Sequence, residues 1–402
     1  MTCAKSVGHF CSRGGERRRR RPAPAAGRAW AFPLLGLVQG VFAAVYHVAP
    51  DGDDAHPGSP ERPLRTVQRA VDRARAGDTI VVRAGVYREA VVLRESGEEG
   101  RPIVLKNHPG ERPILQPGQP GQAPPGQGIR LQARAGYQHP IGWIALEGLE
   151  IRHGHDGIKF YNAHHVTIRN CFVHDNWHQG ILGNGYRVRI EGNVIARNGL
   201  RPDNERSNLE HGIYVTGTEI EIVNNVIHGN RAYGIQVAGY PYNPGAHAGP
   251  EFAGARRWRI HHNTIALQRN RAGVVLWQPQ TTDCTIQNNI FYRNAQTLGR
   301  GACQGVDFVN AGGGHRICRN LFFGPERTAW SQPPEGCRIE ENLEGQDPLF
   351  MDADRGDFRL RAGSPAIDAG LTEGAPKKDR EGRTRPQGGG VDLGAHEFQR
   401  GL

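Results

Sequence analysis

The chain has 402 residues and a formal net charge of +10, but the charge is unevenly distributed. Residues 1–43 contain eight Lys or Arg and one acidic residue, Glu16, so the remaining 359 residues carry only +3. The basic character therefore belongs to an N-terminal arm, and the rest of the chain gives no support for a nucleic-acid partner.

The N-terminal arm has the pattern of an export signal. The arginine run 17–21 precedes an apolar stretch over 31–38, and the small-residue sequence Val41-Phe42-Ala43 follows. We expect residues 1–43 to be a signal peptide and the mature chain to begin near Ala44, secreted or periplasmic and with no membrane attachment after cleavage. An uncleaved anchor is an alternative, because 29–46 is a marginal membrane span, and a twin-arginine signal is another.

A short helix is predicted over 63–76. Five apolar residues fall on one helical face, between Pro63 and Gly77: Leu64, Val67, Ala70, Val71 and Ala74. Pro is favoured at the start of a helix and Gly after its end. The strand-like segment 79–82 comes next, so the helix is placed to cap a β-structure at its N-terminal end.

An internal repeat occupies the middle of the chain. Each unit has an apolar-x-Ile segment, an Asn, a second Asn and then Gly followed by alternating apolar residues, with period 2 typical of short strands. A unit of this size cannot bury its apolar face alone and must stack on its neighbours. The repeat therefore predicts an all-β fold, a right-handed parallel β-helix over 44–345, with the first Asn of each unit stacked as a turn ladder: Asn170, Asn193, Asn225, Asn263, Asn289, Asn320 and Asn342.

The repeat is lost from about residue 346, where Asp, Gly and Pro become frequent. An open β-helix exposes sheet edges, so both ends require covering. We expect 346–402 to be an irregular cap that closes the far end. The five cysteines after the arm are an odd number, which argues against a disulfide scaffold: Cys171, Cys284, Cys303, Cys318 and Cys337.

Two segments carry a resemblance to a known family. The segment 44–87 resembles the N-terminal coil of exported bacterial β-helix proteins in the pectate-lyase-like superfamily, and 364–370 with 388–397 resembles their closing segment. The resemblance implies the β-helix fold and export. It also implies chemistry on polysaccharides, although this superfamily holds lyases, hydrolases, epimerases and non-catalytic members.

Alignment on the Gly of each unit brings ionisable and aromatic residues into columns. His155, His178 and Glu210 stand two places before the Gly, and Asp156, His211 and Tyr233 stand one place before it. Lys159, Tyr214 and Gln236 stand two places after it. These groups crowd the first four coils, which predicts a functional groove at that part of the helix.

The first functional hypothesis is a lyase that cleaves a uronic-acid-containing polysaccharide by β-elimination. This reaction needs a base, an acid for the leaving oxygen and a group that neutralises the sugar carboxylate. Lys159, His178 or His211 would be the base and Tyr214 the acid or the base. Substrate-binding candidates are Asp156, Asn184, Arg201, Arg206, Tyr233, Gln236, Tyr240 and Tyr242, several of them in the insertions 199–209 and 239–254.

A second hypothesis is a divalent metal site formed by His155, His178 and Glu210, since two imidazoles and a carboxylate suit a transition metal. Such a site would serve a metal-dependent glycoside hydrolase or epimerase, whereas the lyase hypothesis requires no cofactor. The motifs of the mannuronan epimerases and polygalacturonases and the acidic calcium set of pectate lyases are not evident. A third alternative is a non-catalytic carbohydrate-binding or cell-surface protein. In each case we expect a monomer whose partner is a polysaccharide.

Overall fold

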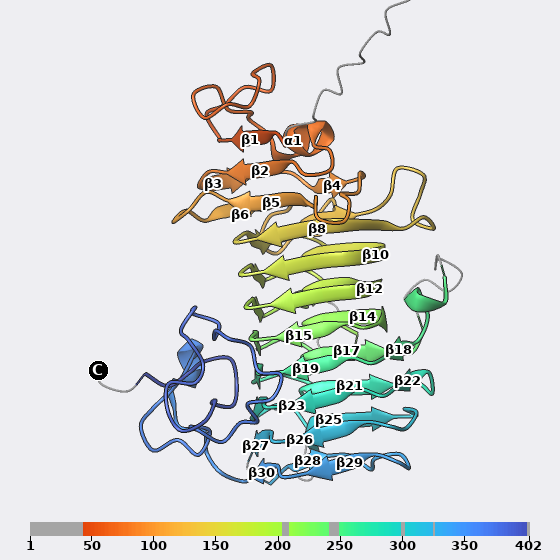
Figure 1. Ribbon diagram of the computed structural model, residues 1–402, viewed down its shortest axis with the longest axis vertical. Helices are drawn as coiled ribbons and strands as arrows, with labels where there is room; N and C mark the ends of the chain where they lie inside the picture. Colours follow the sequence, from red (N-terminus) through yellow and green to blue (C-terminus); the bar gives the residue numbers. More distant parts are fainter. Residues whose placement is uncertain (1–42, 203–208, 241–248, 299–301, 325, 400–402) are drawn as a thin grey trace, which may run out of the picture. The chain divides into compact units, whose positions relative to one another are not determined.

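The computed structural model describes residues 43–202, 209–240, 249–298, 302–324 and 326–399, so the expected signal peptide lies outside it. From residue 43 onward the chain winds through successive coils whose parallel strands stack in three columns (Figure 1). This arrangement confirms the predicted parallel β-helix. Within the described residues, no helix is long and apolar enough to cross a membrane.

The first column carries the predicted groove. Its register runs Ile158, Ile181, Ile213, Ile235, Val274 and Val306, as the Gly alignment requires. Its strands are β4 (Val91–Leu93), β7 (Ile129–Leu131), β10 (Ile158–Arg169), β12 (Ile181–Glu191), β14 (Ile213–Thr218), β17 (Ile235–Ala238), β21 (Val274–Trp277), β25 (Cys303–Val309) and β28 (Thr328–Trp330).

The second column also receives the C-terminal halves of β10 and β12, which bend from one column into the next. Its own strands are β1 (Val45–Val48), β2 (Thr79–Val82), β5 (Ile103–Asn107), β8 (Ile141–Glu147), β15 (Glu221–Val223), β19 (Arg259–His261), β23 (Thr285–Gln287), β26 (Arg316–Cys318) and β29 (Arg338–Glu340). Two short strands stack on the C-terminal end of β14: β18 (Ala255–Arg256) pairs with β14, and β22 (Thr281–Thr282) pairs with β18.

The third column forms a separate parallel sheet. Its strands are β3 (Gly85–Tyr87), β6 (Pro113–Leu115), β9 (Glu150–Arg152), β11 (Phe172–His174), β13 (Val194–Ala196), β16 (Val226–His228), β20 (Thr264–Ala266), β24 (Ile290–Tyr292), β27 (Leu321–Phe323) and β30 (Leu343–Glu344). The inward side chains of all three columns are mostly Ile, Val and Leu, and they form one continuous core. Trp258 is fully buried in it, as its inward position predicts.

The N-terminal helix α1 (Val67–Arg73) is shorter than the predicted 63–76. The Thr66 hydroxyl accepts a hydrogen bond from the Arg69 N–H, which sets the start of the helix. Leu64 instead pairs with Val48 of β1, a strand that precedes the helix and pairs in parallel with β2. The first coil therefore begins at β1 rather than at 79–82.

The predicted asparagine ladder exists with one correction. From Asn193 to Asn320, each side-chain amide donates to the Oδ1 of the ladder residue in the next coil, at 2.9–3.0 Å, and Asn342 accepts the last of these hydrogen bonds. Asn170 is not a member. It lies in the left-handed region at φ 54°, and Cys171 takes the ladder position, with its N–H donating to Asn193 Oδ1 at 2.9 Å. All five described cysteines are free thiols.

The C-terminal segment is irregular, as predicted, but it does not lie where we expected. It contains an antiparallel pair, β31 (Phe350–Asp352) and β32 (Asp357–Leu360), beside the 3-10 helix η3 (Ala353–Arg355). Its apolar side chains pack on the outward faces of β16, β20, β24 and β27, so this segment runs back along the side of the coils (Figure 1). A second 3-10 helix, η2 (Pro250–Phe252), lies in the 239–254 insertion.

Candidate functional site

Glycine fixes the spacing of the groove. A Cβ on Gly157 would lie 2.6 Å from the carbonyl oxygen of Gly180 and 2.4 Å from a methyl carbon of Val173. Gly180 and Gly212 face the next coil at similarly short distances. Only glycine permits this approach, which explains why the glycine recurs and why the flanking residues stay in register.

A second amide ladder holds the turns that precede the groove strands. The Gly154 N–H donates to Asn176 Oδ1 at 2.9 Å, and the Asn176 side chain donates to Asn198 Oδ1 at 2.9 Å. These buried hydrogen bonds anchor the turn that carries His155 and Asp156. The side chains of His155 and Asp156 are therefore attached to a backbone whose position is fixed by hydrogen bonds.

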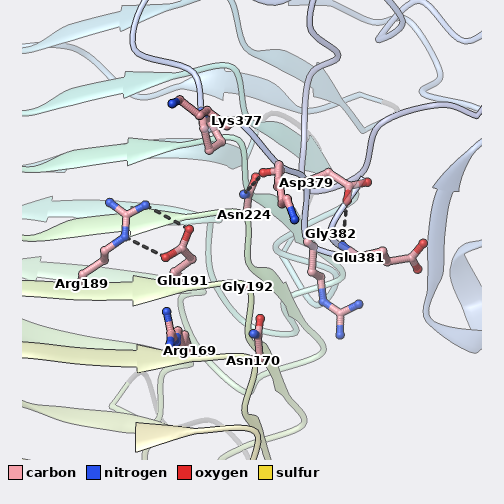
Figure 2. Close-up of a pocket in the computed structure, with 13 residues that line it drawn as sticks. Arg169, Asn170, Arg189, Glu191, Gly192, Asn224, Lys377, Asp379, Glu381 and Gly382 are labelled. Atoms are coloured by element: carbon pink, nitrogen blue, oxygen red, sulfur yellow. Dashed lines mark hydrogen bonds and ion pairs between the residues drawn. The ribbon is translucent and has the colours of Figure 1, made fainter. Parts of the chain in front are cut away.

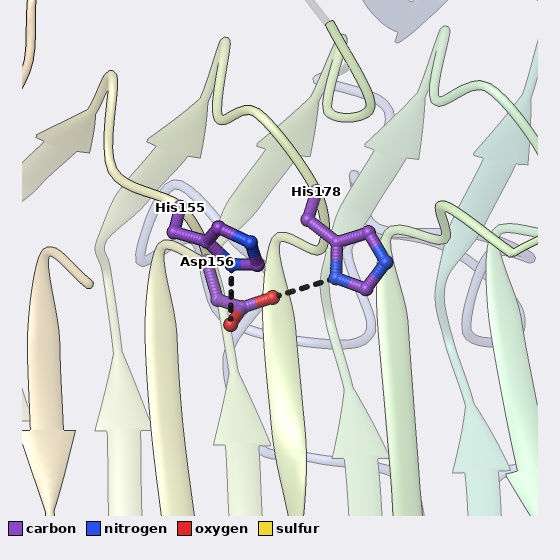
Figure 3. Close-up of side chains that lie close together, drawn as sticks. All are labelled: His155, Asp156 and His178. Carbon is purple, nitrogen blue, oxygen red and sulfur yellow. Dashed lines mark hydrogen bonds and ion pairs between the residues drawn. The ribbon is translucent and has the colours of Figure 1, made fainter. Parts of the chain in front are cut away.

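The centre of the site is the carboxylate of Asp156, which is fully buried. Its Oδ1 lies 3.1 Å from His178 Nδ1, and its Oδ2 lies 3.2 Å from His155 Nδ1 and 3.5 Å from Lys159 Nζ. Figure 3 shows one carboxylate oxygen turned toward each imidazole. We call these four residues the Asp156 cluster.

The electrostatics of the cluster favour an ionised Asp156. Burial alone would raise the pKa of this carboxyl group, but hydrogen bonds from His155 and His178 together with the Lys159 charge hold it well below the usual range. A carboxylate can only accept hydrogen bonds, so each imidazole donates through Nδ1. In the neutral tautomer with the proton on Nδ1, the Nε2 atom carries the lone pair. His178 Nε2 is thus a candidate base oriented by a buried acid.

His211 is fully buried, contrary to what a catalytic base requires. Burial first, and then the charges of His178 and Arg271, lower the pKa of His211 to about 3. Its Nδ1 accepts a hydrogen bond from the Tyr233 N–H at 3.2 Å, so the proton of the neutral ring sits on Nε2. That atom has no hydrogen-bond partner among the described residues. The ring packs edge-on against Tyr214, with centroids 5.7 Å apart.

The outward residues of the groove strands follow one another as Lys159, Leu182, Tyr214, Gln236 and Val275. Each coil advances the chain by about 4.8 Å, so Lys159 and Tyr214 stand about 10 Å apart with Leu182 between them. Leu182 is 1% exposed and provides an apolar floor. The structure thus places Lys159 and Tyr214 on either side of Leu182, on the outward face of the same column.

Tyr233 is turned toward the later coils. Its hydroxyl donates to Asp307 Oδ2 at 2.8 Å. Burial, reinforced by the Asp307 carboxylate, raises the pKa of Tyr233 above its ordinary value. The two residues stand two coils apart. The alignment on the Gly of each unit gave no sign that they pair.

Several other candidate residues lie away from the cluster. Asn184 pairs its amide with Asn162, donating to Oδ1 at 2.7 Å. Arg201 is exposed, and its carbonyl accepts a hydrogen bond from Arg231. The Tyr240 hydroxyl accepts one from Gln280 at 2.6 Å. Two further candidates, Arg206 and Tyr242, lie outside the described residues.

The two insertions do not flank the same end of the groove. The 199–209 insertion precedes the start of β14, whereas the 239–254 insertion follows the end of β17. Parallel strands stacked in register align their starts and their ends. The first insertion therefore borders the side of the Asp156 cluster, and the second borders the opposite end of the strands.

The cluster's donor set bears on which metal it would accept. Ligand atoms of His155, Asp156 and His178 all lie within 4.8 Å of one another, and Glu210 is not part of this group. Calcium prefers an oxygen-rich cluster, and the described residues here supply one carboxylate beside two imidazoles and an ammonium group. This set does not fit calcium. Two imidazoles and a carboxylate fit a transition metal, with Lys159 as a competing cation.

A cavity of about 550 Å³ lies in the second column, against the C-terminal segment 376–382 (Figure 2). Its charged lining is largely paired: Arg189 contacts Glu191 at 2.8 Å. Asn224 donates to the Lys378 carbonyl at 2.7 Å, which ties the C-terminal segment to the coils. This cavity belongs to that junction and not to the groove column.

Comparison with known proteins places this geometry in a family. The family model "Pel9A-like, right handed beta helix region" matches residues 46–199, which include the whole Asp156 cluster. The structure resembles the crystal structure of pectate lyase Pel9A with a TM-score of 0.58 and 18% sequence identity, over 90% of this chain and 98% of that one. Residues 46–199 are thus similar to this pectate-lyase-like family, and the chain has its right-handed parallel β-helix fold.

The rest of the groove falls under a second family model, "Protein of unknown function (DUF1565)", which matches residues 198–322. Pectate lyase PEL9 of Emericella nidulans is 37% identical over 106 residues, 26% of this chain and 24% of that protein. Uncharacterized protein YwoF of Bacillus subtilis is 26% identical over 164 residues, 37% of this chain and 29% of that protein. The matched parts thus span less than a third of these curated relatives.

Proposed function

We propose that this protein is an exported lyase that cleaves a uronic-acid-containing polysaccharide by β-elimination. The observation that carries the proposal is the buried Asp156 carboxylate, which orients His178 and holds the Lys159 ammonium group at the start of the groove. A base and a fixed cation held beside one another are two of the three groups that this reaction needs.

His178 is the proposed base. Its side chain is 16% exposed, so Nε2 can reach a substrate while Nδ1 stays bound to Asp156. The imidazole takes the proton from the carbon next to the sugar carboxylate. The electron pair of that C–H bond forms the new carbon–carbon double bond as the glycosidic C–O bond breaks. Asp156 stabilises the imidazolium that results.

Lys159 and Tyr214 supply the other two roles. The Lys159 ammonium neutralises the charge that develops on the uronate carboxylate. The Tyr214 hydroxyl, two coils away, donates a proton to the leaving oxygen. His211 is a positioning residue in this scheme, because it is fully buried and packs against the Tyr214 ring.

Two relatives support this proposal, since pectate lyase PEL9 of Emericella nidulans and pectate lyase Pel9A share parts of the sequence or the fold. The N-terminal arginine run and apolar stretch support export. No step of the scheme passes through calcium, because the donor set of the Asp156 cluster does not fit it.

The test measures the ultraviolet absorbance of unsaturated uronate while the purified protein is incubated with alginate, pectate, glycosaminoglycans and bacterial exopolysaccharides, with and without a chelator. We expect absorbance to rise on one substrate and the rise to persist in chelator. His178→Ala should abolish it. His174→Ala is the matched control, because His174 is also paired with an aspartate but lies on β11 of the third column.

New reducing ends without the absorbance rise would indicate hydrolysis and contradict the proposal. Binding without either product would indicate a carbohydrate-binding protein. A rise that the chelator removes would point to a metal at His155, Asp156 and His178.

A further inference from the structure

A small hollow lies in the same column, beyond the proposed catalytic residues. It has a volume of about 160 Å³. Leu209, Val275 and Val309 form its apolar lining, and Trp277 stands at the end of β21 beside them. Gln236 and Arg271 supply its polar groups. An apolar hollow with a few convergent polar groups is the usual composition of a small-ligand site.

The amide of Gln236 is the observation that points to a ligand. Gln236 is 7% exposed, and its side chain makes no hydrogen bond to any residue that the structure describes. Its amide atoms are not among the fully buried ones, so they keep some exposure and can bind a polar atom that comes from outside the protein. Gln236 lines the hollow, which is where such an atom would enter.

The charge and the aromatic ring define the class of that ligand. Arg271 brings a guanidinium group, whose fork of donors matches a carboxylate. Trp277 is half-buried, so part of its indole surface is open to the hollow. An aromatic face is suited to the apolar face of a sugar ring. Together these groups fit a sugar that bears a carboxylate.

The register places the hollow on the path of the same polymer. Gln236 follows Tyr214 by one coil and Lys159 by three, so it stands about 14 Å along the axis from Lys159. A short oligosaccharide extended along the groove would span this distance. The two sites therefore lie where one substrate chain can occupy both.

We propose that Gln236, Arg271 and Trp277 form a distal subsite that binds a uronate of the polysaccharide chain whose cleavage occurs at the Asp156 cluster. This inference rests on the proposed function for its substrate. It adds that recognition requires a chain long enough to reach the hollow and a charged sugar at that position.

The experiment measures binding of a uronate hexamer by calorimetry and tryptophan fluorescence, in the His178→Ala background so that no product forms. The hexamer comes from whichever polysaccharide gives product, or is hexagalacturonate if none does. Trp277→Leu and Gln236→Leu are each expected to weaken binding at least tenfold. The carboxyl-reduced, neutral hexamer should bind at least tenfold more weakly than the acidic one.

Trp143→Leu is the matched control, because Trp143 lies on β8 and stacks on His165 away from the hollow. It should change binding less than twofold. Two substituted residues are used so that misfolding of one variant, seen by circular dichroism, leaves the other as the test.

The two proposals fail in different ways. Hexamer binding that depends on Trp277 and Gln236, in a protein that forms no unsaturated product, supports the subsite and contradicts the lyase. Product formation with hexamer binding unaffected by both substitutions contradicts the subsite alone. Absence of hexamer binding, or equal binding of the acidic and neutral hexamers, also overturns the subsite.

Discussion

Replacement of Asp156 by Asn gives the sharpest test of the cluster. The amide has nearly the same shape as the carboxylate but carries no charge. Its NH₂ group is a donor, so it cannot accept the hydrogen bonds that one carboxylate oxygen accepts in the wild type. The wild-type carboxylate meets His178 Nδ1 at 3.1 Å, His155 Nδ1 at 3.2 Å and Lys159 Nζ at 3.5 Å. All three contacts weaken together in D156N.

The magnitude follows from the geometry. Two unit charges 3.5 Å apart attract by about 5 kcal/mol at an effective dielectric constant of about 20. Removal of one member of a buried pair costs about 3–5 kcal/mol, because the other charge stays buried. Lys159 is 8% exposed, so we expect D156N to unfold at lower denaturant concentration by about that free energy. The rate should fall about 10³–10⁴-fold, since an imidazole that loses its carboxylate loses its tautomer and orientation.

Two measurements check this expectation: unfolding in urea, and product absorbance per folded molecule. Asp175→Asn is the matched control, because Asp175 also accepts from an imidazole, His174 Nδ1 at 2.6 Å, but lies beside the third column. It should keep activity within about twofold. If folded D156N retained more than about a tenth of the wild-type rate, the Asp156–His178 pair would not be the base of the reaction.

Three further predictions rest on individual side chains. Tyr214→Phe should lower the rate about 10²–10⁴-fold while hexamer binding stays near wild type, and equal loss of both would contradict its role as acid. The unfolded chain protonates His211 near pH 6.5 and the folded chain only near pH 3, so stability is lost as the pH falls through this window, about 2 kcal/mol between pH 7 and pH 5. His211→Gln should reduce that slope in urea titrations at each pH, and an unchanged slope would refute it. Asn263→Ala removes the acceptor of the Asn225 backbone N–H and the side-chain donor to the Ile222 carbonyl, and should cost about 2–6 kcal/mol. Asn170→Gly, outside the ladder, should cost less than about 1 kcal/mol by the same urea assay.

Sequence reasoning found the β-helix because its determinants recur at every coil. An inward Ile and a close-packed Gly are needed each time the chain passes, so both leave a repeating trace. Asn170 shows the limit of this reasoning. Counting asparagines placed it in the ladder, yet the true repeat there is 22 residues, from Cys171 to Asn193, and a thiol holds the position.

The course of the C-terminal segment could not be predicted from its own residues, because Phe350, Phe358 and Leu360 follow no repeat. The sequence feature that indicates this course is the apolar character of the strand surface that these residues cover. Outward positions of the third column are apolar at Ile290 and Leu321, where a solvated face would carry polar groups. Outward apolar residues on a solenoid indicate a surface that another segment buries.

The candidate site could be predicted from the sequence only in part. Columns could be aligned from the sequence, and they brought His178, Lys159 and Tyr214 to one face. Which side chains meet depends on rotamers and burial, so the role of Asp156 as the shared partner and the burial of His211 emerged only from the structure.

The register of the stacked coils bears on substrate specificity under the proposed function. Each coil contributes one outward residue at this position, so under the proposed function an extended polymer would meet the charged end of Lys159, the apolar Leu182, the hydroxyl of Tyr214 and the amide of Gln236 in fixed order. Because parallel pairing keeps successive coils about 4.8 Å apart, one substitution alters one contact without moving the others. Substrate preference in such a groove can therefore change residue by residue while the fold and the Asp156 cluster stay the same.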